Sequence, residues 1–221
     1  MTHSSAHPAK VLIVDDHELV RRGLVEMIDR EADLAVCGEA ADAPTAMARI
    51  REQGPDIVVA DITLAHGDGL ELVKQVQAAY PKVRVLVLSM HDEQLYAERA
   101  IRAGAMGYVG KNEPAEAIVD AVRNILRGRV HVSERFANRV VQRMAVQGGA
   151  DEGTPLDTLS DREVEVLTLL GDGLSTRAVA EHLHLSTKTI HTYREHLKAK
   201  LGLDSASELV RYAVARNLLG D

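Results

Sequence analysis

Residue types that mark disulfide-rich, secreted or membrane-spanning proteins are scarce in this sequence. Its single cysteine, Cys37, excludes an intrachain disulfide and a cysteine-based zinc site. Because Cys37 lies within the apolar run of residues 34–38, we expect a buried thiol in a strand. The longest uncharged stretch, residues 1–9, is polar, so we expect neither a membrane span nor the apolar segment of a signal peptide. We therefore expect a cytoplasmic protein that makes no contact with a membrane.

The composition itself is typical of a folded protein with two domains. The chain has 221 residues, of which 46% are hydrophobic and 27% charged, so it can bury a core and still present a charged surface. Its net charge of −7 argues against a nucleic-acid partner, but the charges are unevenly distributed. Residues 151–186 include two basic and eight acidic residues, whereas residues 187–216 include six basic and three acidic ones. The second segment predicts a local positive patch on an acidic chain.

Short β-branched runs alternate with longer helical patterns in the first part of the chain. The predicted strands are residues 11–14, 34–39, 56–60, 83–88 and 106–109, and the predicted helices are residues 17–30, 43–53, 68–79, 92–103 and 113–127. This alternation predicts an α/β domain over residues 9–128, with a flavodoxin-like, doubly wound sheet of five parallel strands. We expect Asn112 to cap the last helix, with Pro114 in its first turn. Residues 1–8 are expected to be disordered.

The second half of the chain changes to an all-helical pattern. Residues 129–155 predict a linker that includes one helix, from Ser133 to about Gln147, followed by a stretch rich in glycine. Residues 156–221 predict a small all-α domain of four helices. A serine precedes each of them: Ser160, Ser175, Ser186 and Ser205. The first and last of these serines form capping boxes with Glu163 and Glu208.

The ends of the predicted strands bring together a chemically coherent group of side chains. In an open parallel sheet the ligand site lies beyond the carboxyl ends of the strands. The residues expected there are Asp15, Asp16, Asp61, Ser89 and Lys111. Three carboxylates repel one another unless a proton or a cation joins them, and Mg²⁺ accepts oxygen ligands and retained waters. A carboxylate beside Mg²⁺ is also a nucleophile towards phosphorus, and lysine and hydroxyl groups can hold the other phosphoryl oxygens.

These five residues, each after a strand, resemble the receiver domain of bacterial two-component response regulators over about residues 9–128. The resemblance implies that Asp61 accepts a phosphoryl group from a sensor histidine kinase. It implies that Lys111 and Ser89 contact this group and that Tyr108 is the aromatic residue that responds to it. The implied Mg²⁺ ligands are Asp15 (through water), Asp16, Asp61 and the backbone carbonyl of Thr63. Many family members have proline where this chain has Ala65, a difference that concerns the shape of a loop.

The basic segment of the second domain lies within a predicted helix-turn-helix, residues 179–190. In the helix that begins at Ser186, a helical projection places Ile190, Leu197 and Leu201 on one stripe, which we expect to face the core. The opposite face carries Lys188, His191, Thr192, Glu195 and Ala199, flanked by Lys198 and Lys200. Such a face suits a helix in the major groove, where central side chains read bases and cations at the edges contact phosphates. A solvated helix face is the alternative.

Residues 159–170, 173–181 and 186–194 closely resemble the LuxR-type DNA-binding domain. A receiver followed by this domain resembles the NarL/FixJ class of transcription factors, which implies double-stranded DNA as a partner. The implied base-reading residues are His191, Thr192 and Glu195, and the implied phosphate contacts are Lys188, Lys198 and Lys200. Two roles remain open for Arg194: a contact with a DNA phosphate, or an ion pair with the acidic first helix of the domain. Many members have lysine at the position of His191, so no operator sequence is inferred.

Together these patterns favour a two-component response regulator that acts as a transcription factor. We expect phosphorylation of Asp61 to draw Ser89 inward, with Tyr108 following, and to promote a homodimer that binds promoter DNA. A phosphatase with an aspartyl intermediate needs a substrate-binding insertion or a lid, and neither is visible, so we expect no dedicated enzyme. The alternative is a phosphorylation-independent transcription factor with an idle receiver pocket.

Overall fold

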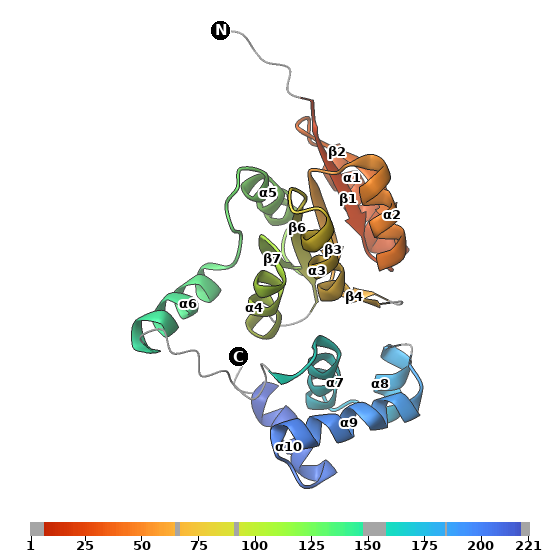
Figure 1. The fold of residues 1–221 in the computed structure, drawn as a ribbon, viewed down its shortest axis with the longest axis vertical. Coiled ribbons are helices and arrows are strands. Elements are labelled where there is room, and N and C mark those ends of the chain that lie inside the picture. The colour runs from red at the N-terminus through yellow and green to blue at the C-terminus, as the bar shows by residue number, and fades with distance from the viewer. Residues whose placement is uncertain (1–6, 65–66, 91–92, 148–157, 184, 218–221) are drawn as a thin grey trace. The chain divides into compact units, whose positions relative to one another are not determined.

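The computed structural model describes residues 7–64, 67–90, 93–147, 158–183 and 185–217. The chain divides into two compact units, Met1–Arg143 and Met144–Asp221 (Figure 1). Most of the expected disordered N-terminus, the glycine-rich part of the expected linker and Ala65 lie outside the described residues.

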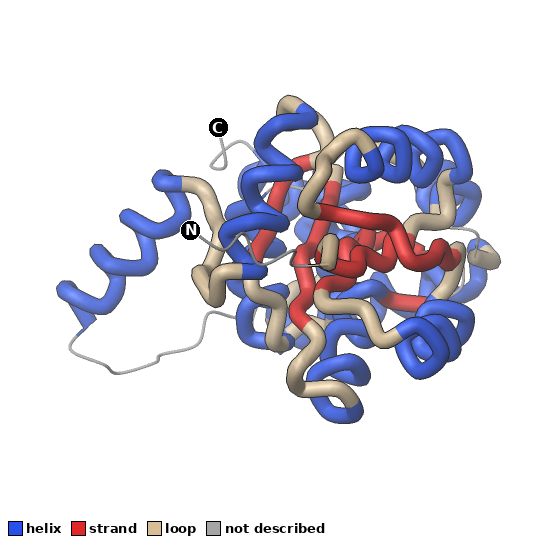
Figure 2. Tube along the Cα trace, turned by 90° about the horizontal axis from the view of Figure 1, so that it is seen from above, coloured by secondary structure: helices blue, strands red, loops and turns tan. Residues whose placement is uncertain are grey.

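A five-stranded parallel sheet forms the centre of the first unit. Its strands are β1 (Ala9–Val14), β2 (Leu34–Ala40), β3 (Ile57–Asp61), β6 (Arg84–Ser89) and β7 (Gly107–Gly110). They are hydrogen-bonded in the order β2-β1-β3-β6-β7, and every pair is parallel. In Figure 2 these strands form the red group at the centre of the view. The predicted flavodoxin-like, doubly wound sheet is confirmed.

The helices of this unit follow the strands along the chain. They are α1 (Glu18–Asp29), α2 (Ala43–Gln53), α3 (Gly69–Ala79), α4 (Glu93–Ala103) and α5 (Ala115–Leu126). Helix α1 contacts α5, while α3 contacts both α2 and α4, as expected when helices are divided between two faces of a sheet. Leu24 and Ile28, one helical turn apart on α1, join Ile118 and Val122 of α5 in one buried cluster over the strands.

The beginning of α5 departs from the prediction. Pro114, in an extended conformation and without a side-chain capping bond, precedes the helix, which starts at Ala115. The expected cap at Asn112 is therefore wrong. The N–H of Glu113 donates to the carbonyl of Gly110 at 3.0 Å, which holds these residues in a turn that ends β7. The helix can begin only after this turn, at a proline whose φ already suits it.

Cys37 lies in a strand, as expected, but it is half-buried rather than buried. The reason is the position of β2 at one end of the sheet, where a neighbouring strand is present on one side only. Burial raises the pKa of the Cys37 thiol, so it is less reactive than a free thiol.

The second unit is all-helical over the residues that the structure describes. Helix α6 (Glu134–Gln147), which the pattern from Ser133 to about Gln147 predicts, leads from the first unit into the second. The remaining helices are α7 (Asp161–Gly171), α8 (Thr176–His182), α9 (Thr187–Leu201) and α10 (Ala206–Asn217). Each of the last four begins directly after its predicted serine, and both capping boxes are present. Helix α9 contacts α7, α8 and α10, and its Ile190 and Leu197 are fully buried.

None of the helices in the described parts of the chain is long and apolar enough to cross a bilayer.

Candidate functional site

The strand order brings the predicted acidic residues to one place. Asp15 follows β1 and Asp61 ends β3, and these two strands are neighbours in the sheet. The chain winds in opposite directions on either side of this pair, so a crevice opens beyond their carboxyl ends. Ser89 ends β6 and Lys111 follows β7, which places both at the same end of the sheet.

Lys111 connects two of the carboxylates directly. Its ammonium nitrogen Nζ lies 2.6 Å from Oδ2 of Asp15 and 2.6 Å from Oδ2 of Asp61. The side chains are 10% exposed for Lys111, 2% for Asp15 and 5% for Asp61. Two charge-assisted hydrogen bonds in such a buried place fix the ammonium between the two carboxylates. The structure therefore brings Asp15, Asp61 and Lys111 together.

Burial also changes the proton affinity of the central carboxylate. It raises the pKa of Asp61 to about 6, although Lys111 and the N–H of Thr63 act in the opposite direction. Burial lowers the pKa of Lys111, but Asp61 and Asp15 outweigh that effect and raise it above its usual value. Lys111 is therefore a permanent cation, and Asp61 is mostly ionised at neutral pH. An ionised oxygen is what a nucleophile towards phosphorus requires.

Asp16 completes a group of oxygen ligands suited to a hard divalent cation. One ligand atom each from Asp15, Asp16, His17 and Asp61 can be chosen so that all lie within 4.8 Å of one another. Oδ1 of Asp16 is buried and, among the described residues, receives no hydrogen bond. The ring nitrogen Nδ1 of His17 lies 2.8 Å from this oxygen, without the geometry of a hydrogen bond. A buried carboxylate oxygen that lacks a donor fits a metal ligand, and three carboxylates fit Mg²⁺.

The loop after Asp61 is shaped by close backbone contacts. Thr63, whose carbonyl the resemblance assigns to the metal, donates its N–H to Oδ1 of Asp61 at 3.2 Å. Strand β4 (Thr63–Leu64) then pairs antiparallel with β5 (Gly67–Asp68), directly before α3. A Cβ on Gly69 would lie 2.1 Å from the carbonyl oxygen of Asp61. Only glycine fits there, so Gly69 is a requirement of the site that sequence reasoning missed.

Ser89 and Tyr108 are both buried inside the first unit. Ser89 is fully buried, and its carbonyl accepts the N–H of Lys111 at 2.8 Å, which links the ends of β6 and β7. Tyr108 is 2% exposed and pairs with Val87 of β6. The aromatic ring is therefore inside the fold in this structure, on the strand that leads directly to Lys111.

In the second unit, the exposed face of α9 agrees with the helical projection. Ile190 and Leu197 are buried as predicted. Leu201, also predicted to face the core, is only partly buried, because it is the last residue of α9, where the helix ends. The exposed residues of the opposite face are Lys188, His191, Thr192, Glu195 and Ala199. Helix α8 ends at His182 and α9 begins at Thr187, so this face belongs to the second helix of the predicted helix-turn-helix.

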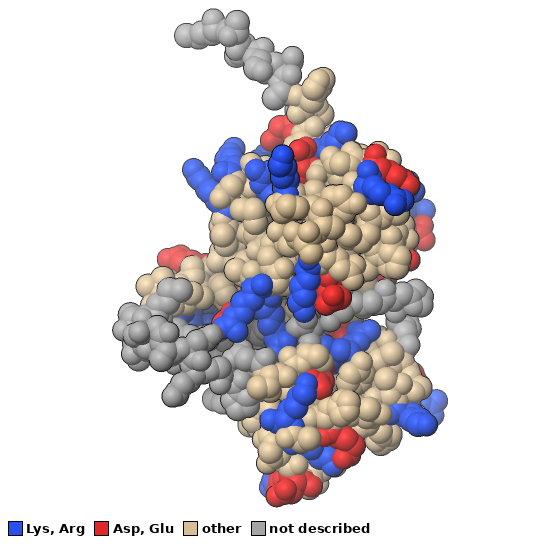
Figure 3. All heavy atoms as spheres, viewed as in Figure 1, with Lys and Arg blue, Asp and Glu red and all other residues tan. Residues whose placement is uncertain are grey.

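Three of the expected DNA contacts have partners within the protein. Nζ of Lys198 lies 2.8 Å from Oε2 of Glu195, one helical turn earlier. Arg194 donates to Oγ1 of Thr176 on α8. Nζ of Lys200 lies 2.7 Å from Oε2 of Glu163, a carboxylate of α7 whose side chain is only 4% exposed. Basic and acidic side chains are interspersed on the face of this unit that Figure 3 shows.

Comparison with known families identifies both units. Residues 11–123 match the response regulator receiver domain, and residues 157–213 match the luxR family of bacterial regulatory proteins. The chain belongs to the NarL/FixJ-type response regulators. Its receiver holds the acidic group at the carboxyl ends of β1 and β3, and its DNA-binding domain holds the helix-turn-helix of α8 and α9.

Relatives of this response regulator share the arrangement along their whole length. The oxygen regulatory protein NreC of Staphylococcus epidermidis is 33% identical over 215 residues, which cover 95% of this chain and 99% of the relative. The crystal structure of the response regulator ChrA, from a heme-sensing two-component system, is 33% identical with a TM-score of 0.52, covering 96% of this chain and 100% of that one. RcsB of Salmonella enterica serovar Typhimurium, bound to a promoter with BeF3⁻, shares the fold at 23% identity and a TM-score of 0.61, covering 94% and 99%.

One further contact in this response regulator had no signal in the sequence. Nη1 of Arg21, on α1, donates to the carbonyl oxygen of Asp15 at 2.7 Å, and its Nε lies 3.2 Å from Oε2 of Glu39. Arg21 thereby holds the backbone directly before Asp16. In the sequence it is one of two adjacent arginines in an amphipathic helix, where the usual interpretation is a solvent-facing charge.

Proposed function

We propose that this response regulator is a transcription factor that a sensor histidine kinase activates by phosphorylating Asp61, and that it is not a dedicated enzyme. The observation that carries the proposal is the buried Lys111 ammonium, which bridges Asp15 and Asp61 at the carboxyl ends of β1 and β3. A phosphoryl group on Asp61 adds negative charge next to a permanent cation, so the site is prepared to hold it. The protein would contact both the kinase and the DNA in the cytoplasm.

In the transfer, an Oδ atom of Asp61 forms a bond to phosphorus while the P–N bond of the kinase's phosphohistidine breaks and its electron pair returns to the imidazole. Mg²⁺, held by Asp15, Asp16, Asp61 and the Thr63 carbonyl, would neutralise charge on the phosphoryl oxygens. Lys111 keeps Asp61 ionised and pairs with a phosphoryl oxygen after transfer. The hydroxyl of Ser89 donates to another, which draws the end of β6 towards the site.

The phosphorylated protein forms a homodimer, and its α9 helices enter the major groove of double-stranded DNA. Movement of Ser89 leaves space next to the buried ring of Tyr108, and the surface formed by α4 and α5 changes as that ring follows. Two helix-turn-helix units in a symmetric dimer contact half-sites about one DNA turn apart. RcsB, which has the same fold, is described as forming dimers bound to DNA, and this supports the proposal. His191, Thr192 and Glu195 lie exposed on α9 and would read base edges.

The test is intact-protein mass spectrometry after incubation with Mg²⁺ and acetyl phosphate, with Asp61→Ala in parallel. We expect an adduct of about 80 Da, the mass of one phosphoryl group, that requires both Mg²⁺ and Asp61. A sizing column then measures the shift towards dimer, and a matched Asp120→Ala variant, which removes an exposed carboxylate of α5, keeps the adduct. The chain has no tryptophan, so indole fluorescence cannot replace these readouts.

DNA binding decides between phosphorylation-dependent and phosphorylation-independent action. Duplexes selected from a random-sequence pool with the acetyl phosphate-treated chain serve as the probe. The proposal predicts that Asp61→Ala loses the gain in affinity that acetyl phosphate gives the unaltered chain. If no adduct forms and Asp61→Ala binds DNA as tightly as the unaltered chain, the receiver pocket is idle and the proposal is refuted.

A further inference from the structure

The segment after α5 is built into the sheet of the receiver. The N–H of Tyr108 donates to the carbonyl of His131 at 2.9 Å, and the N–H of His131 donates to the carbonyl of Met106 at 2.9 Å. His131 thus forms a parallel bridge with Gly107, on the side of β7 that faces away from β6. The approach is so close that a Cβ on Gly107 would lie 2.8 Å from the His131 carbonyl oxygen. The chain therefore leaves the receiver along the strand that carries Tyr108.

Two residues later, Ser133 is held by the first residue of α4. The N–H of Ser133 donates to Oε1 of Glu93 at 2.9 Å, and its hydroxyl donates to Oε2 of the same carboxylate. Oγ of Ser133 also accepts the N–H of Phe136 at 3.0 Å, so Ser133 is the cap of α6. We call the pair of hydrogen bonds between Glu93 and Ser133 the Glu93–Ser133 clasp. It joins the beginning of α4 to the beginning of α6.

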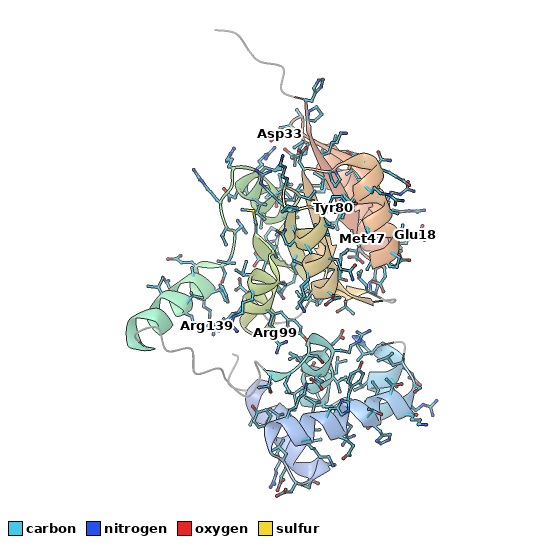
Figure 4. The ribbon with its side chains drawn as sticks, viewed as in Figure 1. Glu18, Asp33, Met47, Tyr80, Arg99 and Arg139 are labelled. Carbon is cyan, nitrogen blue, oxygen red and sulfur yellow. The ribbon has the colours of Figure 1, made fainter. Side chains whose placement is uncertain are left out.

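The first turns of α6 carry one buried aromatic side chain. Phe136 is 6% exposed, and the guanidinium of Arg139 lies 5.4 Å from the centre of its ring. Figure 4 labels Arg139 on α6, the helix through which the chain continues towards the DNA-binding unit. The Glu93–Ser133 clasp and, before it, the bridge between His131 and Gly107 join the beginning of α6 to the receiver.

Ser89 and Tyr108, the two residues expected to move on phosphorylation, lie within a few residues of these contacts. Glu93 is four positions after Ser89, and the peptide N–H of Tyr108 is itself bonded to His131. We propose that the Glu93–Ser133 clasp holds α6 in its unphosphorylated position, and that the movement of Ser89 on phosphorylation withdraws Glu93 and releases α6. This inference rests on the proposed function, since it names the contact through which phosphorylation of Asp61 reaches the linker.

If Ser133 served only to cap α6, it would not need Glu93. The Ser133 hydroxyl caps α6 by accepting the Phe136 N–H, and this bond needs no carboxylate. Glu93 binds both donors of Ser133, and a carboxylate binds such donors more strongly than a neutral acceptor does. Loss of Glu93 should therefore leave α6 folded but no longer fixed to α4.

The experiment measures hydrogen exchange in the first turns of α6, residues 134–143, in the full chain with and without acetyl phosphate and Mg²⁺. We expect acetyl phosphate to accelerate this exchange in the unaltered chain. Glu93→Gln and Ser133→Ala should each accelerate it without acetyl phosphate, and acetyl phosphate should add nothing further. Ser133→Thr, which keeps a hydroxyl, should behave like the unaltered chain. Glu71→Gln, which removes an exposed carboxylate from the first turn of α3, is the matched control.

DNA affinity provides the second readout, in a background that cannot be phosphorylated. We expect Asp61→Ala combined with Glu93→Gln to bind the selected duplexes about tenfold more tightly than Asp61→Ala alone, which corresponds to about 1.4 kcal/mol. Adding Ser133→Ala to this pair should change nothing, because both substitutions break the same clasp.

The outcomes separate this inference from the proposed function. If the clasp variants keep the exchange and affinity of their parents, or if acetyl phosphate accelerates exchange in them as much as in the unaltered chain, the clasp is structural only and the inference is overturned. If the unaltered chain gains its adduct but neither α6 exchange nor DNA affinity changes, the proposed function itself fails.

Discussion

Replacing the phosphoacceptor by its neutral isostere, Asp61→Asn, should stabilise the first unit at neutral pH. Burial raises the pKa of Asp61 from 3.8 to about 6, so the folded chain disfavours the ionised form. A difference of about two pKa units corresponds to about 3 kcal/mol in the free energy of unfolding. Asparagine, which is never ionised, avoids this cost. Since a folded-state pKa above the unfolded value makes stability fall as pH rises, the advantage of the Asp61→Asn variant should appear between pH 3.8 and about 6 and be complete above that window.

The assay is urea unfolding of the full chain without Mg²⁺, followed by far-ultraviolet circular dichroism, from below this pH window up to neutral pH. Asp120→Asn, which neutralises an exposed carboxylate on α5, is the control and should change little. The second unit lacks Asp61, so its transition is an internal reference. Equal stability of Asp61→Asn and the unaltered chain at neutral pH would refute the reasoning, as would an advantage that grows on acidification.

Three further predictions concern other contacts. Lys198→Ala should flatten the salt dependence of DNA affinity by about one unit in the log–log slope, and an unchanged slope would exclude this phosphate contact. Gly69→Ala should abolish the phosphoryl adduct, because its Cβ would lie 2.1 Å from a backbone oxygen, whereas Gly23→Ala meets nothing within 4 Å and should keep it. Lys200→Ala should destabilise the second unit by about 1 kcal/mol at neutral pH in urea unfolding. The pKa of Glu163 is lowered below 4.5, despite its burial, by Lys200 and Ser160, so this difference should vanish as pH falls through that lowered value.

Features governed by neighbouring residues could be predicted from the sequence. The serines before α7, α8, α9 and α10 start these helices because a hydroxyl satisfies an N–H only three residues ahead. The meeting of Asp15, Asp61 and Lys111 could also be predicted, since parallel strands deliver their carboxyl ends to one edge. The sequence could not show that the ammonium already bridges both carboxylates, because this depends on side-chain packing across the sheet.

Features that depend on partners distant in sequence could not be predicted. Lys200 was expected near DNA phosphates, and that remains a prediction, but in this structure it pairs with Glu163, 37 residues earlier. Arg194 contacts Thr176 on the neighbouring helix rather than an acidic residue of α7. Asparagine often caps helices, but Asn112 lies in the turn that ends β7, and α5 begins only at Ala115. The two-residue strands β4 and β5 are too short to give a periodic pattern.

The bridge between His131 and β7 has a consequence for engineering this protein. Without it, β7 would be the outermost strand of the sheet, with its backbone N–H and C=O groups open to another chain. A chimaera that fuses a foreign output domain directly after Gly128 would remove this cover and expose a strand edge that can recruit further copies. A junction placed beyond Ser133 keeps the edge protected, so the receiver can be transplanted without aggregation only if it takes the first residues of its connector with it.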